Sequence, residues 1–118
     1  MDTQKQFKTF DDLVFSPHPH FKDLAVQANL TLDNGYSFSV VANVEGGTFV
    51  YGNHPDTYEV AVFNQRGNPV PLSVSGDHLS YQQPHEISAL MRQFEMDGIL
   101  HEHLLVAIRQ DYNEKQPL

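Results

Sequence analysis

Between Val26 and Val44 the apolar side chains fall on every second position of the chain. A period of two is typical of a strand with one buried face and one face toward water. The pattern is interrupted once, at Asp33-Asn34-Gly35, and then resumes on the same parity. It predicts two paired strands, and their buried positions are Val26, Ala28, Leu30 and Leu32, then Tyr36, Phe38, Val40, Ala42 and Val44.

The parity also predicts the turn between these strands. Residues that lie opposite each other in an antiparallel pair share a face of the sheet. A two-residue loop would place Leu32 opposite Ser37 and put the two apolar sets on opposite faces. A three-residue loop, 33–35, places Leu32 opposite Tyr36 and keeps them together. We therefore predict a three-residue hairpin with a bulge at Gly35, where glycine accepts a left-handed conformation without a Cβ penalty.

Shorter patterns extend the sheet on both sides of this hairpin. Each is a run of β-forming or alternating residues bounded by Gly, Pro or Asn, and together they indicate an antiparallel meander. Two prolines, Pro69 and Pro71, lack the N–H that a ladder needs, so the last run is predicted to be an exposed edge strand. The runs are 10–15, which prolines at 17 and 19 must stop, 48–51, 57–63 with Tyr58, Val60 and Val62 on one face, and the alternating Val70, Leu72 and Val74.

After residue 83 the apolar period changes to that of a helix. Ile87, Leu90, Met91 and Phe94 lie at i, i+3, i+4 and i+7, which makes one apolar stripe. Pro84 suits the first helical position. A capping box of Ser80 with Gln83 would start the helix a turn earlier. Gly98 predicts the end of this helix.

The segment from Ile99 to Gln110 fits two structures. Leu100, Leu104, Ala107 and Ile108 fit one helical face, whereas residues 104–108 could also form a buried strand. We prefer a second helix. The predicted fold class is α+β, an antiparallel β-meander of about five strands with one or two C-terminal helices packed on one face. The single domain 1–118 would comprise a flexible arm (1–9), the sheet (10–75), a helical region (80–110) and a tail (111–118).

Composition indicates an ordinary globular chain. It has 118 residues, 40% of them hydrophobic, and a mean hydropathy of -0.42, which is enough for one core. No apolar run approaches the ~20 residues of a membrane span, and the first residues lack the layout of a secretion signal. Cysteine is absent, so there is no disulfide framework. We expect a cytoplasmic protein without membrane association.

The net charge of -8 restricts the partners. Binding of nucleic-acid phosphates needs a basic surface, so we expect no direct nucleic-acid binding. The acids are scattered along the chain, which favours a role in solubility. Imitation of nucleic acid, or binding to a basic partner, is the minority alternative.

Seven histidines are the unusual feature of the composition. His18 and His20 have a His-x-His spacing that would let both rings share one face of an extended segment and bind a transition metal. The same spacing in His101 and His103, on a helix, turns the two rings about 200° apart. Neither pair has a carboxylate at a recognised motif spacing, so solvated loop histidines are the preferred interpretation, and no metal site is predicted.

The chain lacks an ordered catalytic signature. It contains no Gly-x-Ser-x-Gly elbow, no phosphate-binding glycine loop and no cysteine nucleophile. The strand aromatics could stack on bases, but their parity and the shortage of Arg and Lys favour core packing. We therefore favour a non-enzymatic protein without a cofactor.

Several segments resemble a family of small, uncharacterised tailed-bacteriophage proteins. Members of that family share a Phe-x-Asp-Leu-x-Phe-x-Pro-His-Pro opening, which residues 10–19 match, and an Asn-Gly-Tyr hairpin, which residues 34–41 match. The family's Tyr-Glu-Leu-Ala-Val strand is similar to residues 58–62, which have Val60 in place of its leucine and follow in the same order. The resemblance covers about residues 10–95 and implies no known reaction. This chain departs from the family around Val70 to Asp77, where an acidic segment is replaced, and in its longer tail.

We therefore expect a small acidic phage-type protein that acts as a protein-interaction module. It would bind a host or viral factor, in the host cytoplasm if phage-encoded, and could inhibit that factor. The segment 99–108 could equally build a homodimer. The alternative is a histidine-rich metal-binding protein or metal-dependent enzyme, in which His18 and His20 would be joined by His54, His78 or His85. The predicted interaction surface comprises Val70, Leu72, Val74, Leu100, Leu104 and Ile108.

Overall fold

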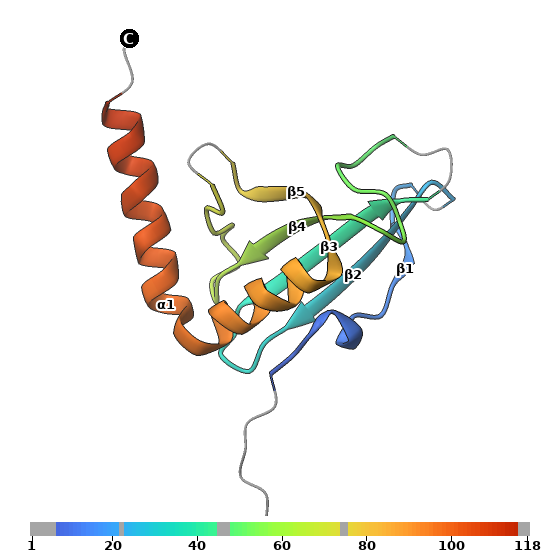
Figure 1. Cartoon of the computed structure of the whole chain (residues 1–118), viewed down its shortest axis with the longest axis horizontal. Coiled ribbons are helices and arrows are strands. Elements are labelled where there is room, and N and C mark those ends of the chain that lie inside the picture. Colours follow the sequence, from blue (N-terminus) through green and yellow to red (C-terminus); the bar gives the residue numbers. More distant parts are fainter. Residues whose placement is uncertain (1–6, 22, 45–47, 74–75, 116–118) are drawn as a thin grey trace, which may run out of the picture.

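Five antiparallel strands form one sheet, and a long helix follows them in the chain (Figure 1). The computed structural model describes residues 7–21, 23–44, 48–73 and 76–115. The strands lie side by side in chain order, which is the predicted meander. The sheet consists of β1 (Ser16–Pro17), β2 (Ala25–Thr31), β3 (Ser37–Asn43), β4 (Tyr58–Phe63) and β5 (His78–Gln82).

The β2–β3 hairpin has the predicted register. Leu30 lies opposite Phe38, and the amide of Leu32 donates to the carbonyl of Tyr36 at 2.7 Å. The amide of Gly35 donates back to the carbonyl of Leu32, and Gly35 has a φ of 94°. A left-handed residue at this place closes a three-residue loop without strain only when it is glycine. The three-residue loop with glycine in the left-handed position is therefore confirmed.

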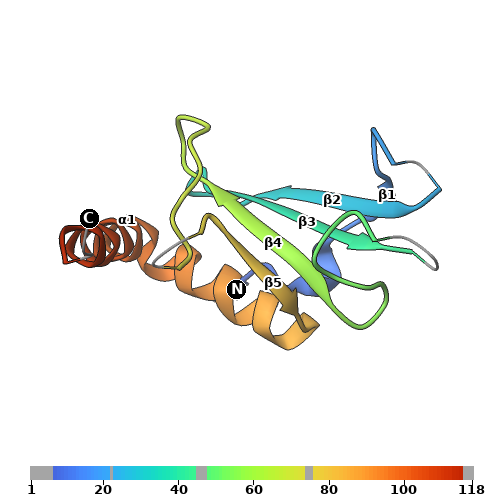
Figure 2. The same cartoon turned by 90° about the horizontal axis from the view of Figure 1, so that it is seen from above.

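One face of the sheet carries the core, and the first part of α1 covers that face (Figure 2). The alternating residues of β3 and β4 point into it, as predicted, because successive side chains of a strand point to opposite faces. The opposite face carries Gln27, Asn29, Thr31 and Ser39, none of which is buried. The core residues that the strands supply include Ala28, Phe38, Val40, Ala42, Tyr58, Val60 and Val62, and Tyr36 joins them from the hairpin connection.

Two of the shorter predicted strands were wrong. Residues 10–15 contain a 3₁₀ turn, Phe10–Asp12, whose start is capped by Thr9 and Asp12. Residues 48–51 form no strand, and 49–51 are bends, because the side chain of Asn43 takes over backbone hydrogen bonds of this segment. Asn43 accepts from the amides of Phe49 and Val50 and donates to the carbonyls of Val50 and Gly52. These groups are therefore not available for a ladder.

The predicted edge strand at 70–74 is not a strand over its described residues, 70–73. Val70 is fully buried and Leu72 is 9% exposed, so both lie in the core under the sheet edge. The Val70 amide donates to the carbonyl of Val62, but the described residues 70–73 form no ladder, which agrees with the two prolines. The edge strand beside β4 is β5, where Leu79 pairs with Val60 next to an irregularity in register.

The helix α1 (Pro84–Glu114) begins where it was predicted, with Pro84 in its first turn. Gln83 and Glu86 form its capping box, so the alternative start at Ser80 was wrong. Its backbone departs from helical geometry at Asp97, with φ -143° and ψ 42°. We call residues 84–96 the proximal helix and residues 98–114 the distal helix. The proximal helix lies across the sheet, and the distal helix leaves it at an angle (Figure 1).

The chain ends differ from the prediction too. Residues 1–6 lie outside the described part, but residues 7–9 are not a loose arm. The Lys8 amide donates to the Glu95 carboxylate at 3.1 Å, and Arg92 lies 4.9 Å from the centre of the Phe7 ring. The predicted tail is helical as far as Glu114. No helix in the described ranges is long and apolar enough to cross a membrane.

Candidate interaction surface

The direction of the distal helix is set by the β2–β3 hairpin. Gly98 lies against the ring of Tyr36, so close that a Cβ built on it would be 2.4 Å from a ring carbon. One turn earlier, the carbonyl of Phe94 accepts a hydrogen bond of 2.8 Å from the side chain of Asn34. Gln65 in turn donates to the Asn34 carbonyl at 2.7 Å. Gly98 permits the close approach, and the hairpin loop holds the bend.

A partly buried polar cluster attaches the first turns of the distal helix to the sheet. The Tyr36 hydroxyl donates to Glu102 Oε1 at 2.8 Å, and the Asn64 side chain donates to Oε2 at 3.0 Å. Both carboxylate oxygens therefore have partners, as a group removed from water requires. Burial, together with the neighbouring Glu102 carboxylate, raises the pKa of Tyr36 to about 12. The tyrosine stays a proton donor at every physiological pH.

Arg109 makes a second attachment about two turns further on. Its guanidinium forms an ion pair with Asp77 at 2.6 Å and donates to the carbonyl of Ser73 at 2.8 Å and to that of Gly76. A guanidinium has enough donors in one plane to hold several oxygens together. Beside this attachment an open hollow lies between Pro71 and the distal helix, where Val106 and Arg109 line it. Two fixed points give the distal helix a defined position.

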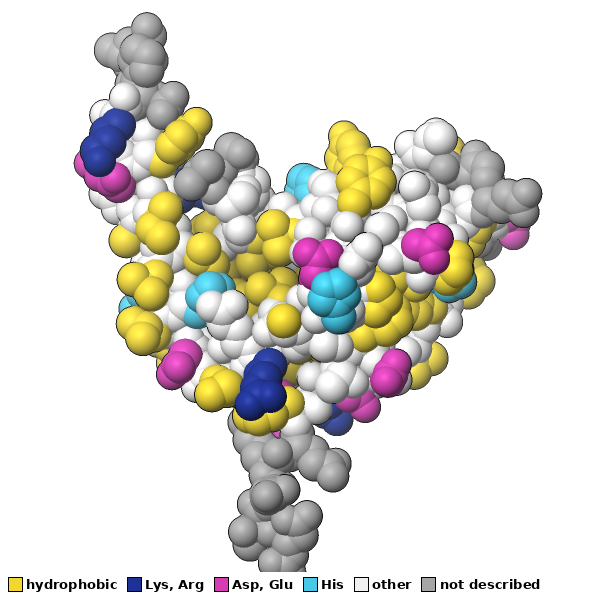
Figure 3. Space-filling view, in the orientation of Figure 1, with side chains coloured by type: hydrophobic (Ala, Val, Ile, Leu, Met, Phe, Trp, Pro, Cys, Tyr) yellow, Lys and Arg dark blue, Asp and Glu magenta, His cyan; other side chains and the backbone are white. Residues whose placement is uncertain are grey.

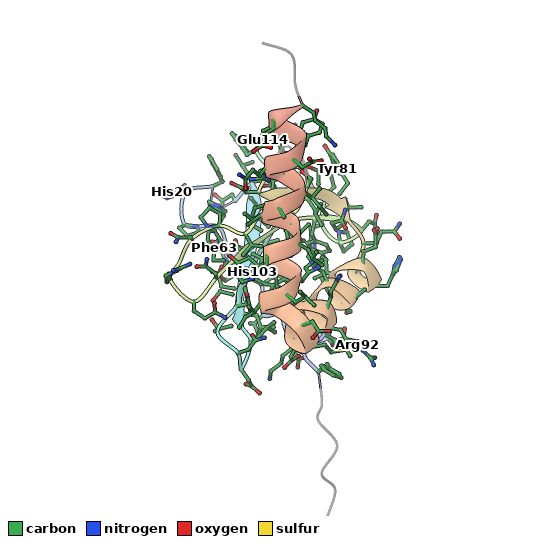
Figure 4. All side chains as sticks on the ribbon, turned by 90° about the vertical axis from the view of Figure 1, so that its left-hand side faces the viewer. His20, Phe63, Tyr81, Arg92, His103 and Glu114 are labelled. Atoms are coloured by element: carbon green, nitrogen blue, oxygen red, sulfur yellow. The ribbon has the colours of Figure 1, made fainter. Side chains whose placement is uncertain are left out.

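The side of the distal helix away from these attachments is apolar and uncovered. Leu100 is 59% exposed, and Leu104 and Ile108 are each 52% exposed. Their spacing of four residues makes them one ridge along the helix. We call Leu100, Leu104 and Ile108 the distal stripe. Hydrophobic side chains are visible along the projecting helix in Figure 3, and in Figure 4 this helix stands in front of the sheet.

The structure thus divides the predicted interaction surface. Leu100, Leu104 and Ile108 lie together on the distal stripe. Val70 and Leu72 lie in the core and are not available as a surface, because the segment folds under the edge of the sheet. Val74 lies outside the described residues. A continuous exposed patch of large aliphatic side chains is typical of a binding surface.

The histidines do not converge. The His18 ring accepts a hydrogen bond from the His20 amide, and the two ring centres are 5.9 Å apart. Over the ranges that the structure describes, no three His, Cys, Asp or Glu side chains come close enough to hold a metal ion. His101 instead packs edge-on against Phe94, with ring centres 4.9 Å apart, and burial lowers its pKa. His103 is exposed on the distal helix.

Sequence reasoning missed the residues that hold the distal helix. Glu102 and Arg109 are seven residues apart, which places them on one helical face. Leu105, between them on that face, is partly buried against the core. Two charged residues flanking a leucine on one face could have identified the side that meets the body of the protein. Their partners come from connections at the end of the sheet, Tyr36 directly before β3 and Asn64 directly after β4, and are distant in the sequence.

Comparisons of the chain with family models, with curated proteins and with solved structures found no match.

Proposed function

We propose that this protein is a non-enzymatic protein-interaction module and that the distal stripe is its binding surface. The exposure of three large aliphatic side chains on one ridge of a projecting helix carries the proposal. Leaving such a ridge in water is unfavourable by roughly 25 cal/mol for each Å² of apolar surface that a partner could cover. Amphipathic helices commonly bind partners through residues at this spacing.

The two attachments support the proposal because they reduce the cost of binding. A helix that is already folded and oriented loses little conformational freedom when it meets a partner. Glu102 and Arg109 provide this rigidity on one side, while the distal stripe on the other side stays uncovered. The resemblance to small tailed-bacteriophage proteins fits the same proposal, with a host or viral protein, or a second copy, as the partner.

Site-specific photo-crosslinking tests the proposal. A photoreactive phenylalanine at Leu104, expressed in cells, should yield discrete crosslinked species after irradiation. The control is the same residue at Val14, which is 83% exposed but lies far from the distal helix in the chain. Absence of any adduct from position 104, with a folded protein, would refute the proposal. Equal adducts from both positions would refute it too, because they would reflect exposure alone.

A further inference from the structure

We infer that Asn34-Gly35 is a site of spontaneous deamidation, and that the reaction loosens the bend between the proximal and distal helices. The inference goes beyond the proposed function and does not depend on it. It follows from the chemistry of an Asn-Gly pair and from the place of the Asn34 side chain, which binds the end of the proximal helix. The product is an acid, so the change in the bend is one-way.

The reaction needs only water and the chain itself. The Gly35 nitrogen gives up its proton and attacks Asn34 Cγ, the bond from Cγ to Nδ2 breaks, and the leaving amide takes up a proton and departs as ammonia. Water then opens the cyclic succinimide to aspartate or isoaspartate. Asparagine is a chemically labile residue, and a following glycine has no Cβ to hinder the attack. Asn34 is exposed to water, and no other asparagine of the chain precedes a glycine.

The folded chain holds both reacting groups. The Gly35 amide donates to the carbonyl of Leu32 at 2.9 Å, and Asn34 Nδ2 donates to the carbonyl of Phe94 at 2.8 Å. Attack on Cγ therefore requires both hydrogen bonds to break. The rate of deamidation then follows the fraction of molecules in which the hairpin loop has opened locally. A change that strains the bend should therefore speed the reaction.

Deamidation removes the donor that holds the end of the proximal helix. Phe94 lies in the last turn before the break at Asp97. Carbonyl groups in the last turn of a helix need outside donors and carry the negative end of the helix dipole. Asn34 supplies one such donor. An aspartate at this position presents a charged oxygen to the Phe94 carbonyl, so an attractive contact becomes a repulsive one. Isoaspartate also lengthens the main chain of the three-residue loop.

The surroundings of Asn34 make the new charge more unfavourable. Asn34 lines a hollow at the bend together with Glu95 and Asp97, and none of the described residues that line it is Lys or Arg. Asp33 precedes it in the chain. A new carboxylate would therefore lie among carboxylates, which repel one another. The attachment at Arg109 is not touched by the reaction, so we expect a looser bend and not a detached helix.

Peptide mapping by mass spectrometry of the full chain, aged at mildly alkaline pH in heavy-oxygen water, tests the reaction. We expect labelled aspartate and isoaspartate at position 34 before any other asparagine reacts. The rate in native buffer should be at least about tenfold below that in urea, because two hydrogen bonds protect the loop. Gly98→Ala should raise the native rate by about threefold or more, because it strains the bend. Ala107→Gly lowers stability on the same helix without touching the bend and should leave the rate unchanged.

A pair of spin labels tests the consequence for the bend. The chain has no cysteine, so Asn29→Cys on the sheet and His103→Cys on the distal helix, both exposed, give one distance by electron paramagnetic resonance. Asn34→Asp, which reproduces one product, should broaden the distribution of this distance. Asn34→Ala removes the donor without adding a charge and should broaden it less. A control pair within the sheet, Asn29→Cys with Ser80→Cys, should not change.

The outcomes decide both parts of the inference. Conversion at position 34 together with a broader distribution in Asn34→Asp supports it. Earlier conversion at another asparagine, or equal rates in native buffer and in urea, overturns the protected reaction site. An unchanged distribution in Asn34→Asp overturns the effect on the bend, and a distribution no broader than in Asn34→Ala overturns the role of the charge. If circular dichroism shows that Asn34→Asp does not fold, the labelled native chain, measured before and after ageing, takes its place.

Discussion

Replacing Gly98 with alanine should destabilise the protein, although alanine is the better helix former. At an open helical position this exchange stabilises by about 1 kcal/mol. At Gly98 the new Cβ would lie 2.4, 2.9 and 3.2 Å from three carbons of the Tyr36 ring. Carbon atoms normally approach to about 3.5–4.0 Å. The closest of the three distances is about 1 Å shorter than a normal carbon–carbon contact, so either the ring or the distal helix must move by about 1 Å.

The ring cannot move at low cost. Tyr36 is 1% exposed, its ring centre lies 5.1 Å from that of Phe94, and its hydroxyl is bonded to Glu102. Insertion of a methyl group into a well-packed site costs about 1–3 kcal/mol. We take the upper half of that range because an aromatic ring is rigid. Against the gain in helix propensity, the net loss should be about 1–2 kcal/mol.

Equilibrium unfolding in urea, followed by circular dichroism, measures this loss. Ala107→Gly is the matched control, because it makes the reverse exchange at an exposed position of the same helix and should cost about 1 kcal/mol through propensity alone. A second variant, Tyr36→Leu, makes room for the methyl group. In the Tyr36→Leu background, Gly98→Ala should lower the free energy of unfolding by less, or should raise it. A stabilised Gly98→Ala single variant would refute the view that the Tyr36 ring controls the bend.

Three further outcomes follow from the same region. Phe94→Ala should lower the free energy of unfolding by about 3–5 kcal/mol, because the ring is fully buried; a loss below about 1 kcal/mol in urea unfolding would contradict its place in the core. Asn34→Ala should cost about 0.5–1.5 kcal/mol through the lost bond to the Phe94 carbonyl, whereas Asn29→Ala, on the exposed face, should be neutral in the same assay. The raised pKa of Tyr36 favours the folded state below pH 10, and this contribution to stability is lost as the pH rises from 10 to about 12. Over that range the free energy of unfolding should fall less in Tyr36→Phe than in the unchanged protein. Equal decreases would disprove the raised pKa of Tyr36.

The parts of the fold that the sequence predicted are those with a strong local period. The alternation through Leu32 and Tyr36 predicted both which face is buried and how long the loop is, because a one-residue shift in strand register would have turned the apolar side chains to water. The stripe through Phe94 identified the proximal helix for a similar reason. Where one face is buried, the pattern alone specifies register and orientation.

The parts that could not be predicted depend on distant partners. β5 contains a single aliphatic residue, Leu79, and becomes a strand only through pairing with β4. Val70 and Leu72 alternate like a strand, yet they reach the core from a loop. Gly98 predicted the end of the first helix, and the backbone does leave helical geometry one residue earlier, at Asp97. The direction that the chain takes after this break could not be predicted, because Glu102 and Arg109 bind partners that are distant in the sequence. A one-dimensional pattern contains no information about those partners.

The contact between residues 7–10 and the proximal helix bears on how this protein reaches its native state. Lys8 binds Glu95 and Phe10 binds Ser88, which are contacts across 87 and 78 residues of chain. Contacts of such separation slow folding, because a large loop must close before they stabilise anything. During synthesis the apolar face of the sheet stays open until the ribosome has released the proximal helix. The meander can form early, but its apolar face stays open to aggregation and to chaperone binding until the proximal helix covers it.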